Sequence, residues 1–282
     1  MNDTNIAQPP VGPRLSAWAP PFPVNGVGDV SRSVPNRLLA ALPRETCHRL
    51  LPWLEPVKMP LGQQLWEPGG SLRYVYFPTT SVVAHMHALE NGSTAGTALV
   101  GSEGMVGTAL FTGGRAPQSQ AEVFSAGQGF RLSASALLKE FELAGDTTRL
   151  LLRFTQALIT QLAQTAACNR HHTLDQRLCR LLLLILDRTA GTAIVTTHDR
   201  LANMLGVRRE GVTEAVLQLH RDGIAMHARS RITVLDRARL ELRACECYAV
   251  VEREYSRLLP AIAPAAVGQY LSVPSEAAPM WM

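Results

Sequence analysis

The chain has 282 residues, of which 46% are hydrophobic and 18% are charged, a composition typical of a globular protein long enough to hold two domains. Its formal net charge of +4 permits binding to nucleic acid but does not require it. The five scattered cysteines argue against a disulfide framework, no signal peptide opens the sequence, and the longest apolar run, LLLLIL, is shorter than the roughly 20 residues of a membrane span, so we expect a cytoplasmic protein.

Residues 1–34 are rich in proline and have no sustained hydrophobic period. Six prolines lie between positions 9 and 23, and segments of this composition rarely bury enough apolar surface to fold. We therefore predict a disordered arm, to which no function is assigned.

Short β-rich segments follow a helical pattern at 38–51. They are separated by Pro-Gly-Gly, Asn-Gly and Gly-Gly turn signals and comprise residues 72–78, 81–89, 94–100, 120–126 and 129–134. Short strands at this spacing favour a β-sandwich or barrel. The pair Asn91-Gly92, which lies between two of these segments, is typical of a type I′ hairpin turn.

A helical pattern runs from Ser133 to about residue 188, with Gly145 and the region 169–173 as its weak points. Apolar and small residues recur along it every three or four positions, at Leu151, Phe154, Leu158, Leu162 and Thr165. A helix with such a seam often pairs with a copy of itself. The alternative is that the seam packs against the β-domain of its own chain, and the pattern alone does not separate the two.

Two short amphipathic helices separated by Gly206 are predicted near the C-terminus. Their apolar faces comprise Leu201, Ala202 and Leu205 before the glycine and Val212, Ala215, Val216 and Leu219 after it. Glycine at this point lets the chain adopt the left-handed conformation that ends one helix before the next begins. The pattern therefore indicates a helix-turn-helix, with Thr197 as the N-cap of its first helix.

Charged residues gather at the start of the second of these helices. Arg208, Arg209 and Glu210 occupy its first turn, and Thr213 and Glu214 follow one turn later. In a helix-turn-helix this end of the second helix reaches base edges in the major groove, where arginine pairs with guanine and glutamate accepts from cytosine. The simpler interpretation is a solvated helix face, with Glu210 stabilising the helix dipole.

The sequence IAMHARSRITVLD, at 224–236, predicts two strands joined by a tight turn, which is the wing of a winged helix. Arg229 and Arg231 at its tip have the charge needed to contact DNA phosphates. Residues 197–240 contain eight arginines and five acidic residues, so most of the net charge falls in this segment.

Enzymatic and metal-binding alternatives find little support in the sequence. GSEGMVG, at 101–107, has neither the spacing of a dinucleotide loop nor a Walker lysine, and no catalytic triad or carboxylate pair can be assembled, so we predict that the chain is not an enzyme. His85 and His87 share a face of a predicted strand and could bind a metal or haem, although core histidines are the simpler interpretation. Cys245 and Cys247 are too closely spaced for the usual zinc pair. We therefore expect neither a metal nor a cofactor.

In their order along the chain, these segments resemble the Crp/Fnr family of bacterial transcription regulators over residues 45–245. The most specific match is LANMLGVRREGVTEAVLQLHRDGI with the wing RITVLD, preceded by LDQRLCRLLLLILDR, and VGSEGMVGTALF is similar to the glycine-rich turn of the family's β-roll. The resemblance implies an α+β fold with a jelly-roll β-roll. Its expected parts are an arm (1–34), a cyclic-nucleotide-binding-like β-roll (35–138), a long dimerisation or linker helix (139–173), a winged helix-turn-helix (174–245) and a C-terminal extension (246–282).

The same resemblance implies a transcription regulator that binds a twofold-related DNA operator as a homodimer, with RNA polymerase as a further partner and no membrane association. The β-roll would then sense a small-molecule effector or only support the dimer. The alternative is a β-roll that binds a small molecule or a protein, with incidental DNA contact.

The resemblance breaks down where cyclic-nucleotide binders of the family hold their ligand. Gly107 is followed by Thr108, where those binders have a glutamate for the ribose, and Pro117 and Gln118 occupy the place of their phosphate-binding Arg-Ser pair. We therefore expect no cAMP binding, and the effector stays unknown. The candidate effector pocket is the turn that contains Gly104, Gly107, Thr108 and Arg115.

The DNA-binding segment also departs from the family. Arg209 and Glu210 match the family's base-reading pair, whereas the third reading position, arginine in the best-known members, is Glu214. A different operator is therefore expected. Ser230 replaces the frequent glycine at the wing tip, and Cys47 stands alone where the oxygen-sensing branch has a cysteine cluster for an iron–sulfur centre.

Overall fold

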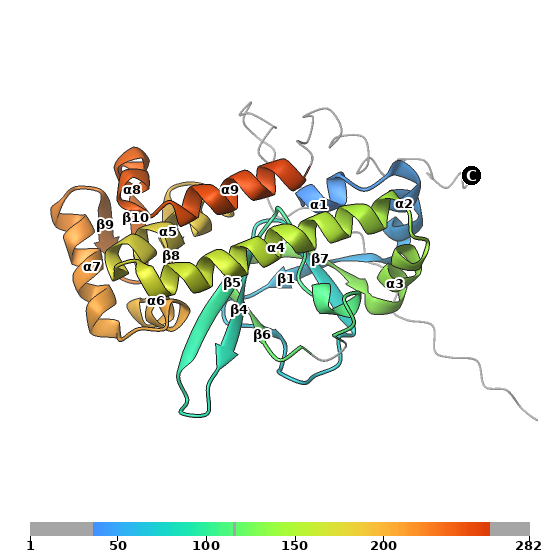
Figure 1. The fold of residues 1–282 in the computed structure, drawn as a ribbon, viewed down its shortest axis with the longest axis horizontal. Coiled ribbons are helices and arrows are strands. Elements are labelled where there is room, and N and C mark those ends of the chain that lie inside the picture. The colour runs from blue at the N-terminus through green and yellow to red at the C-terminus, as the bar shows by residue number, and fades with distance from the viewer. Residues whose placement is uncertain (1–35, 115–116, 260–282) are drawn as a thin grey trace, which may run out of the picture. The chain divides into compact units, whose positions relative to one another are not determined.

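The computed structural model describes residues 36–114 and 117–259, so the predicted N-terminal arm lies outside the described residues. The described chain forms an N-terminal β-roll, a long helix and a C-terminal winged helix, which confirms the predicted α+β fold (Figure 1). None of its described helices combines the length and hydropathy needed to cross a bilayer.

Two antiparallel sheets form the β-roll, one with the strand order β1-β7-β3 and the other with the order β2-β6-β4-β5. The strands are β1 (Leu54–Met59), β2 (Gln64–Trp66), β3 (Tyr74–Pro78), β4 (Val82–Ala88), β5 (Thr94–Val100), β6 (Gln120–Ser125) and β7 (Gly127–Ser133). Short helical segments flank them, namely α1 (Arg37–Ala40), α2 (Arg44–Leu50), η2 (Leu51–Trp53) and η3 (Thr108–Leu110).

The five predicted strands are confirmed as β3 to β7, whereas β1 and β2 were not predicted. Strand β1 lies at the edge of its sheet and pairs only with β7, so most of its side chains stay in solvent. Pro56 is tolerated there because an edge strand needs fewer backbone donors. A strand with a proline and little apolar alternation carries no signal that sequence patterns can detect.

The β4–β5 hairpin is confirmed, but its predicted type I′ turn is wrong. That turn needs positive φ at both central residues, and here Gly92 has φ 80° while Asn91 does not have a positive φ. The amide of Gly92 donates to the carbonyl of Leu89 at 2.9 Å, and the amide of Leu89 donates to the carbonyl of Ser93 at 2.8 Å. The loop therefore has three residues and ends in a left-handed glycine.

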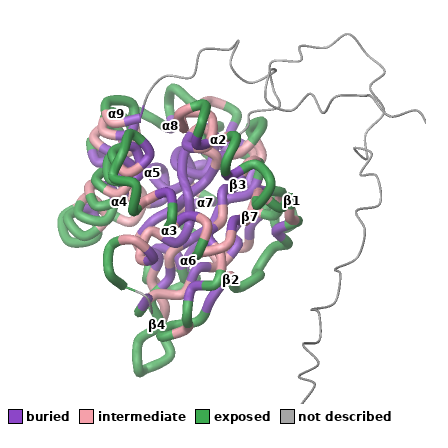
Figure 2. Tube along the Cα trace, turned by 90° about the vertical axis from the view of Figure 1, so that its right-hand side faces the viewer, coloured by how far each residue is buried: buried purple, intermediate pink, exposed green. Residues whose placement is uncertain are grey.

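The long helical region is divided into α3 (Ala134–Glu142) and α4 (Asp146–His171). The break between them includes Ala144, which has a φ of 53°. Within α4, the predicted seam residues Leu151, Phe154 and Leu158 are buried inside their own chain. For these three positions the alternative interpretation, packing against the chain's own β-domain, is therefore the right one. Figure 2 shows the buried residues gathered between the helices and the sheets.

The winged helix follows directly after α4. It comprises α5 (Leu174–Leu186), β8 (Ala193–Val195), α6 (His198–Leu205), α7 (Arg209–Arg221), β9 (Ala225–Ala228) and β10 (Arg231–Val234), and its sheet has the order β8-β10-β9. Thr197 caps α6 by accepting from the amide of Arg200, as predicted. Gly206 ends α6 with φ 64° and ψ 41°, which confirms the predicted left-handed break.

Two further helices, α8 (Arg237–Arg243) and α9 (Cys247–Leu258), follow the wing. Helix α9 lies along α4 (Figure 1), where the ring of Tyr255 meets the ring of Phe154 edge-on at 6.3 Å. The hydroxyl of Tyr255 also donates to Oε1 of Gln161 at 3.0 Å. The predicted C-terminal extension therefore begins with a helix that packs on α4.

Buried and half-buried ion pairs join the winged-helix region to the β-roll. Nε of Arg188, just after α5, lies 2.7 Å from Oε1 of Glu103, and both side chains are almost fully buried. Nη2 of Arg200 on α6 lies 3.0 Å from Oε1 of Glu122 and also donates to the carbonyl of Val123 at 3.0 Å. These contacts determine where α6 and α7 sit relative to the β-roll.

Candidate nucleic-acid interface

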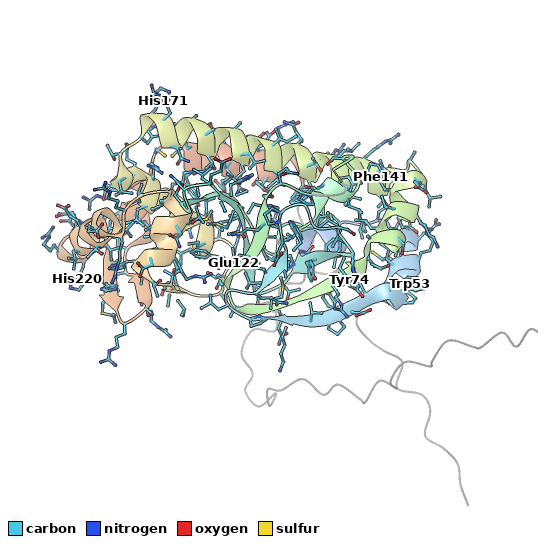
Figure 3. All side chains as sticks on the ribbon, turned by 90° about the horizontal axis from the view of Figure 1, so that it is seen from below. Trp53, Tyr74, Glu122, Phe141, His171 and His220 are labelled. Atoms are coloured by element: carbon cyan, nitrogen blue, oxygen red, sulfur yellow. The ribbon has the colours of Figure 1, made fainter. Side chains whose placement is uncertain are left out.

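Helix α7 presents one face to the protein and the other to solvent. Val212, Val216 and Leu219 are buried against the rest of the winged helix. The opposite face lines a shallow groove formed by Arg209, Glu210, Thr213, Glu214, Leu217 and Arg221. Figure 3 places His220, near the C-terminal end of α7, at the opposite end of the molecule from Trp53. Three predicted base-reading residues, Arg209, Glu210 and Glu214, therefore share one accessible face.

Arg209, the first residue of α7, is exposed and has one ionic partner. Its Nε lies 3.5 Å from Oδ1 of Asp199 on α6, which is also exposed. Ion pairs in solvent are worth about 0–1 kcal/mol, so this one can be exchanged for a base edge at little cost. Arg208 is the N-cap residue of α7, and its side chain makes no capping hydrogen bond.

Thr213 differs from its neighbours in α7 because its hydroxyl already has partners within the protein. The hydroxyl donates to the carbonyl of Arg209 at 3.1 Å and lies 2.9 Å from Nδ1 of His198. With its proton used internally, Thr213 can only accept a further hydrogen bond. Its predicted role in DNA contact is therefore narrowed to that of an acceptor.

His198 is a residue of this interface that sequence analysis missed. Burial lowers the pKa of its imidazole, and the neighbouring His227, whose ring centroid is 4.5 Å away, lowers it further. The imidazole is therefore neutral at physiological pH and can hold Thr213 by a hydrogen bond. No local pattern reveals this contact, because His198 and Thr213 lie on different helices.

The wing carries two exposed arginines at its tip, as predicted. Arg229 and Arg231 flank the turn between β9 and β10, and neither forms an ion pair with any described residue. Ser230 between them has a φ of 49°, in the left-handed region that glycine adopts without strain. The turn therefore keeps the shape expected of the family although glycine is replaced.

The glycine turn of the β-roll, by contrast, is explained by packing. A Cβ added to Gly104 would lie 2.1 Å from Cε2 of Phe154 on α4. Gly107 has a φ of 115°, begins the turn that contains Thr108, and approaches the side chain of Val75. Arg115 lies outside the described residues. A role for this turn in effector binding stays a prediction.

The histidines of β4 do not form a metal site with other described side chains. Burial lowers the pKa of His85 to about 4, with a smaller contribution from His87, and its Nε2 has no hydrogen-bond partner among the described residues. His87 is exposed, and a β-bulge between His85 and Met86 interrupts the alternation on which the shared face was predicted.

The sequence argument against a metal site considered Cys245 and Cys247 alone. The structure brings Cys168 and His172, from the end of α4, next to these two cysteines. Since more than 70 residues separate the two pairs in the chain, spacing rules for short motifs could not have detected the group.

Comparison with known proteins agrees with this architecture. Residues 176–243 match the model of the Crp-like helix-turn-helix domain, while no curated protein matches the chain. FixK2 from Bradyrhizobium japonicum is similar in structure, with a TM-score of 0.59, 19% identity, and coverage of 68% of this chain and 98% of its own. A putative transcriptional regulator of the crp/fnr family from Eubacterium rectale has a TM-score of 0.58 and 15% identity, and covers 71% of this chain and 94% of its own.

A third similar structure is CLP, the c-di-GMP responsive global regulator of Xanthomonas campestris. Its TM-score is 0.55 at 17% identity, and the match covers 68% of this chain and 99% of CLP. At these identities the structural similarity establishes the fold, and the matched domain adds the helix-turn-helix. Together, the matched domain and the shared fold place the chain in the Crp/Fnr family of transcription regulators.

Proposed function

We propose that the chain binds duplex DNA as a homodimer and reads a twofold-related operator with α7. The observation that carries this proposal is the exposed face of α7, where Arg209, Glu210 and Glu214 line one groove at the start of the second helix of a helix-turn-helix. This is the end of the helix that enters the major groove in such motifs. Arg229 and Arg231 in the wing would contact phosphates and position α7 without reading bases.

The proposed dimer uses a face of α4 that differs from the predicted seam. Leu158 is 6% exposed and packs inside its own chain, whereas its neighbour Ile159 is 51% exposed. Leu152 and Ala166, seven residues before and after Ile159, are exposed on the same face. A heptad repeat of exposed apolar residues is the pattern by which two helices pair, so the occupant is a second copy of α4.

The β-roll would serve as the sensor domain of this dimer, with an effector other than cAMP. The groups that would recognise a ribose and a cyclic phosphate are a carboxylate and a guanidinium. Thr108 stands in the place of the first, and Pro117 and Gln118 stand in the place of the second. The identity of the effector, and contact with RNA polymerase, stay predictions.

Replacing Arg209 with alanine tests base reading by α7. Binding is measured against a randomised operator library at two salt concentrations. We expect a loss of about 1–3 kcal/mol per half-site together with weaker preference at one base position. Arg229→Ala is the matched control, which should weaken binding to all sequences alike and reduce the salt slope by about one. If Arg209→Ala weakened all sequences equally, α7 would be a phosphate clamp instead of a reader.

A pair of adjacent substitutions on α4 tests the dimer. Ile159→Asp should give a folded monomer in sedimentation, because the interface would have to bury an unpaired charge. Leu158→Asp should instead destabilise the fold, because Leu158 lies in the core of its own chain. A dimer that survives Ile159→Asp with unchanged affinity would place the interface elsewhere.

A further inference from the structure

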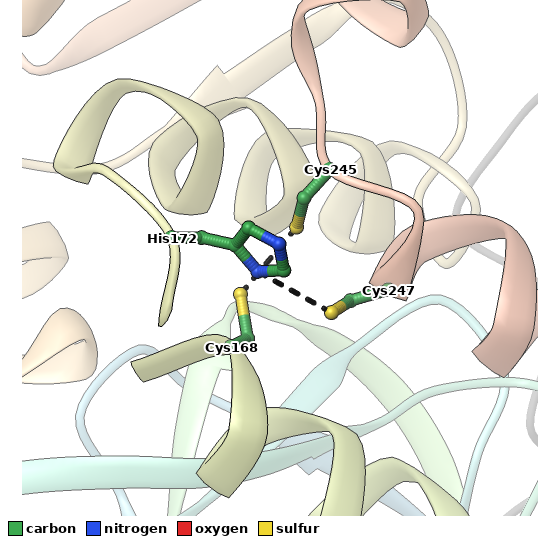
Figure 4. A group of neighbouring side chains, drawn as sticks. All are labelled: Cys168, His172, Cys245 and Cys247. Carbon is green, nitrogen blue, oxygen red and sulfur yellow. Dashed lines mark hydrogen bonds between the residues drawn. The ribbon is translucent and has the colours of Figure 1, made fainter. Parts of the chain in front are cut away.

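Four side chains with metal-binding atoms meet where the end of α4 contacts the segment between α8 and α9 (Figure 4). Cys168 and His172 lie one helical turn apart at the C-terminal end of α4, and Cys245 and Cys247 flank the start of α9. All four ligand atoms lie within 4.8 Å of one another. The group includes no exposed residue, and its three cysteines are buried in a small cluster of their own.

The distances within the group match the coordination of a single ion. Zinc lies about 2.3 Å from thiolate sulfur and about 2.0–2.1 Å from imidazole nitrogen, so the edges of a tetrahedron around it are roughly 3.5–3.8 Å long. The two Sγ atoms of Cys168 and Cys245 are 3.5 Å apart, and Sγ of Cys247 lies 3.6 Å from Nδ1 of His172. An iron–sulfur cluster encloses several ions and bridging sulfides, so its protein ligands must be spaced more widely.

The orientation of His172 is a second, independent indication of a metal ligand. Its Nε2 lies 3.3 Å from Oε1 of Glu246, while Nδ1 faces the sulfur atoms. A proton on Nε2 that is donated to this carboxylate leaves the lone pair of Nδ1 directed toward the cysteines. Histidines that bind metals usually donate their other ring N–H to a carboxylate or carbonyl in this way.

The charge around the group also suits a thiolate-rich zinc site. Three thiolates and one Zn²⁺ ion carry a net charge of −1, which needs a compensating cation when it is buried. The buried guanidinium of Arg180 acts electrostatically on both Cys168 and Cys247. Arg180 donates to Oγ1 of Thr165 at 2.9 Å, which holds it beside α4.

We propose that Cys168, His172, Cys245 and Cys247 bind one Zn²⁺ ion in a closed tetrahedral site. On binding, each neutral cysteine thiol loses its proton to solvent, so up to three protons are released per ion, and no redox change occurs. Four protein ligands leave no position for water, as in structural zinc sites. The ion fastens the end of α4 to the junction between α8 and α9.

This site would link the two functional parts of the proposed regulator. Helix α4 carries the proposed dimer face, and α8 and α9 follow the wing directly in the chain. Loss of zinc should therefore loosen the winged helix relative to the dimer and weaken operator binding. This consequence rests on the proposed function, whereas the zinc content of the protein does not, so the two can fail separately.

The test uses the full chain, purified without a metal-affinity step, with metal content measured by mass spectrometry. We expect one zinc per chain in the native protein, and a loss of bound zinc in Cys168→Ser and Cys247→Ser. Matched controls are Cys179→Ser, which removes a buried cysteine outside the group, and His171→Ala, which removes the exposed neighbour of His172. Both controls should keep one zinc per chain.

Glu246→Gln keeps all four ligands and should lower zinc affinity by about tenfold, which provides a test even if the cysteine variants fail to fold. Replacement of zinc by Co²⁺ should give the visible absorption of a tetrahedral site with thiolate charge-transfer bands. A chain without stoichiometric metal that also fails to bind added zinc would overturn the proposal. So would iron with acid-labile sulfide, a disulfide between Cys168 and Cys245, or full zinc content in Cys247→Ser.

Discussion

The ion pair between Glu103 and Arg188 offers a direct test of how burial determines the worth of a charge. Its two side chains are 10% and 6% exposed, and Nε of Arg188 lies 2.7 Å from the carboxylate. The carboxylate also accepts from the amide of Gly101, at 3.1 Å and 3.2 Å from its two oxygens, while Nη1 of Arg188 donates to the carbonyl of Leu184 at 2.9 Å. The perturbation is Glu103→Gln, which retains the shape of the side chain and removes its charge.

We expect Glu103→Gln to lower the free energy of unfolding by about 3–5 kcal/mol, because it leaves the guanidinium of Arg188 buried without a counter-ion. Domains of ordinary stability have about 5–15 kcal/mol in total, so this loss should be large and easily measured. Burial lowers the pKa of Arg188, but the charge of Glu103 outweighs that effect, and the net pKa is raised. The arginine therefore stays charged when its partner is removed.

The matched control is Glu55→Gln, which removes a carboxylate 2.6 Å from Nη2 of Arg131. The chemistry and the distance are similar, but these side chains are 54% and 36% exposed, so the expected loss is below about 1 kcal/mol. Urea unfolding followed by circular dichroism measures both variants. A double variant, Glu103→Gln with Arg188→Met, should lose less than the sum of its single changes. Equal losses for Glu103→Gln and Glu55→Gln would refute the reasoning.

Three other predictions concern single positions. Because burial lowers the pKa of His85 from its ordinary value of 6.5 to about 4, the unfolded chain takes up a proton first as pH falls, and stability should decrease by up to about 3 kcal/mol between pH 6.5 and 4. His85→Gln should remove this part of the pH dependence of urea unfolding, and an unchanged profile would contradict the assignment. Gly104→Ala should cost about 1–3 kcal/mol in the same assay, because the added methyl collides with Phe154, whereas Gly145→Ala, which meets open space, should cost less than about 1 kcal/mol. Ser230→Gly should raise thermal stability by up to about 1 kcal/mol, since glycine accepts the left-handed conformation, and a lower melting temperature would show that the serine side chain stabilises the wing.

Local signals in the sequence were sufficient for most elements of the fold. Thr197, Gly206 and the alternating strands act over a few residues, because caps, left-handed glycines and pleats are determined by the nearest backbone. The start of α7, with Arg209 and Glu210 in its first turn, followed from the same local rules. Strand β1 escaped them because an exposed edge strand needs neither apolar alternation nor a full set of backbone donors.

Tertiary structure decided which faces and which distant residues meet. Leu158 and Ile159 are both apolar neighbours on one helix, and only the packing of α4 on the β-roll buries the first and exposes the second. The same holds for Cys168, His172, Cys245 and Cys247, which come together because α9 returns along α4 after the wing. A sequence specifies what each residue can do chemically, but partners that are 70 or more positions away are chosen by the packing of whole elements.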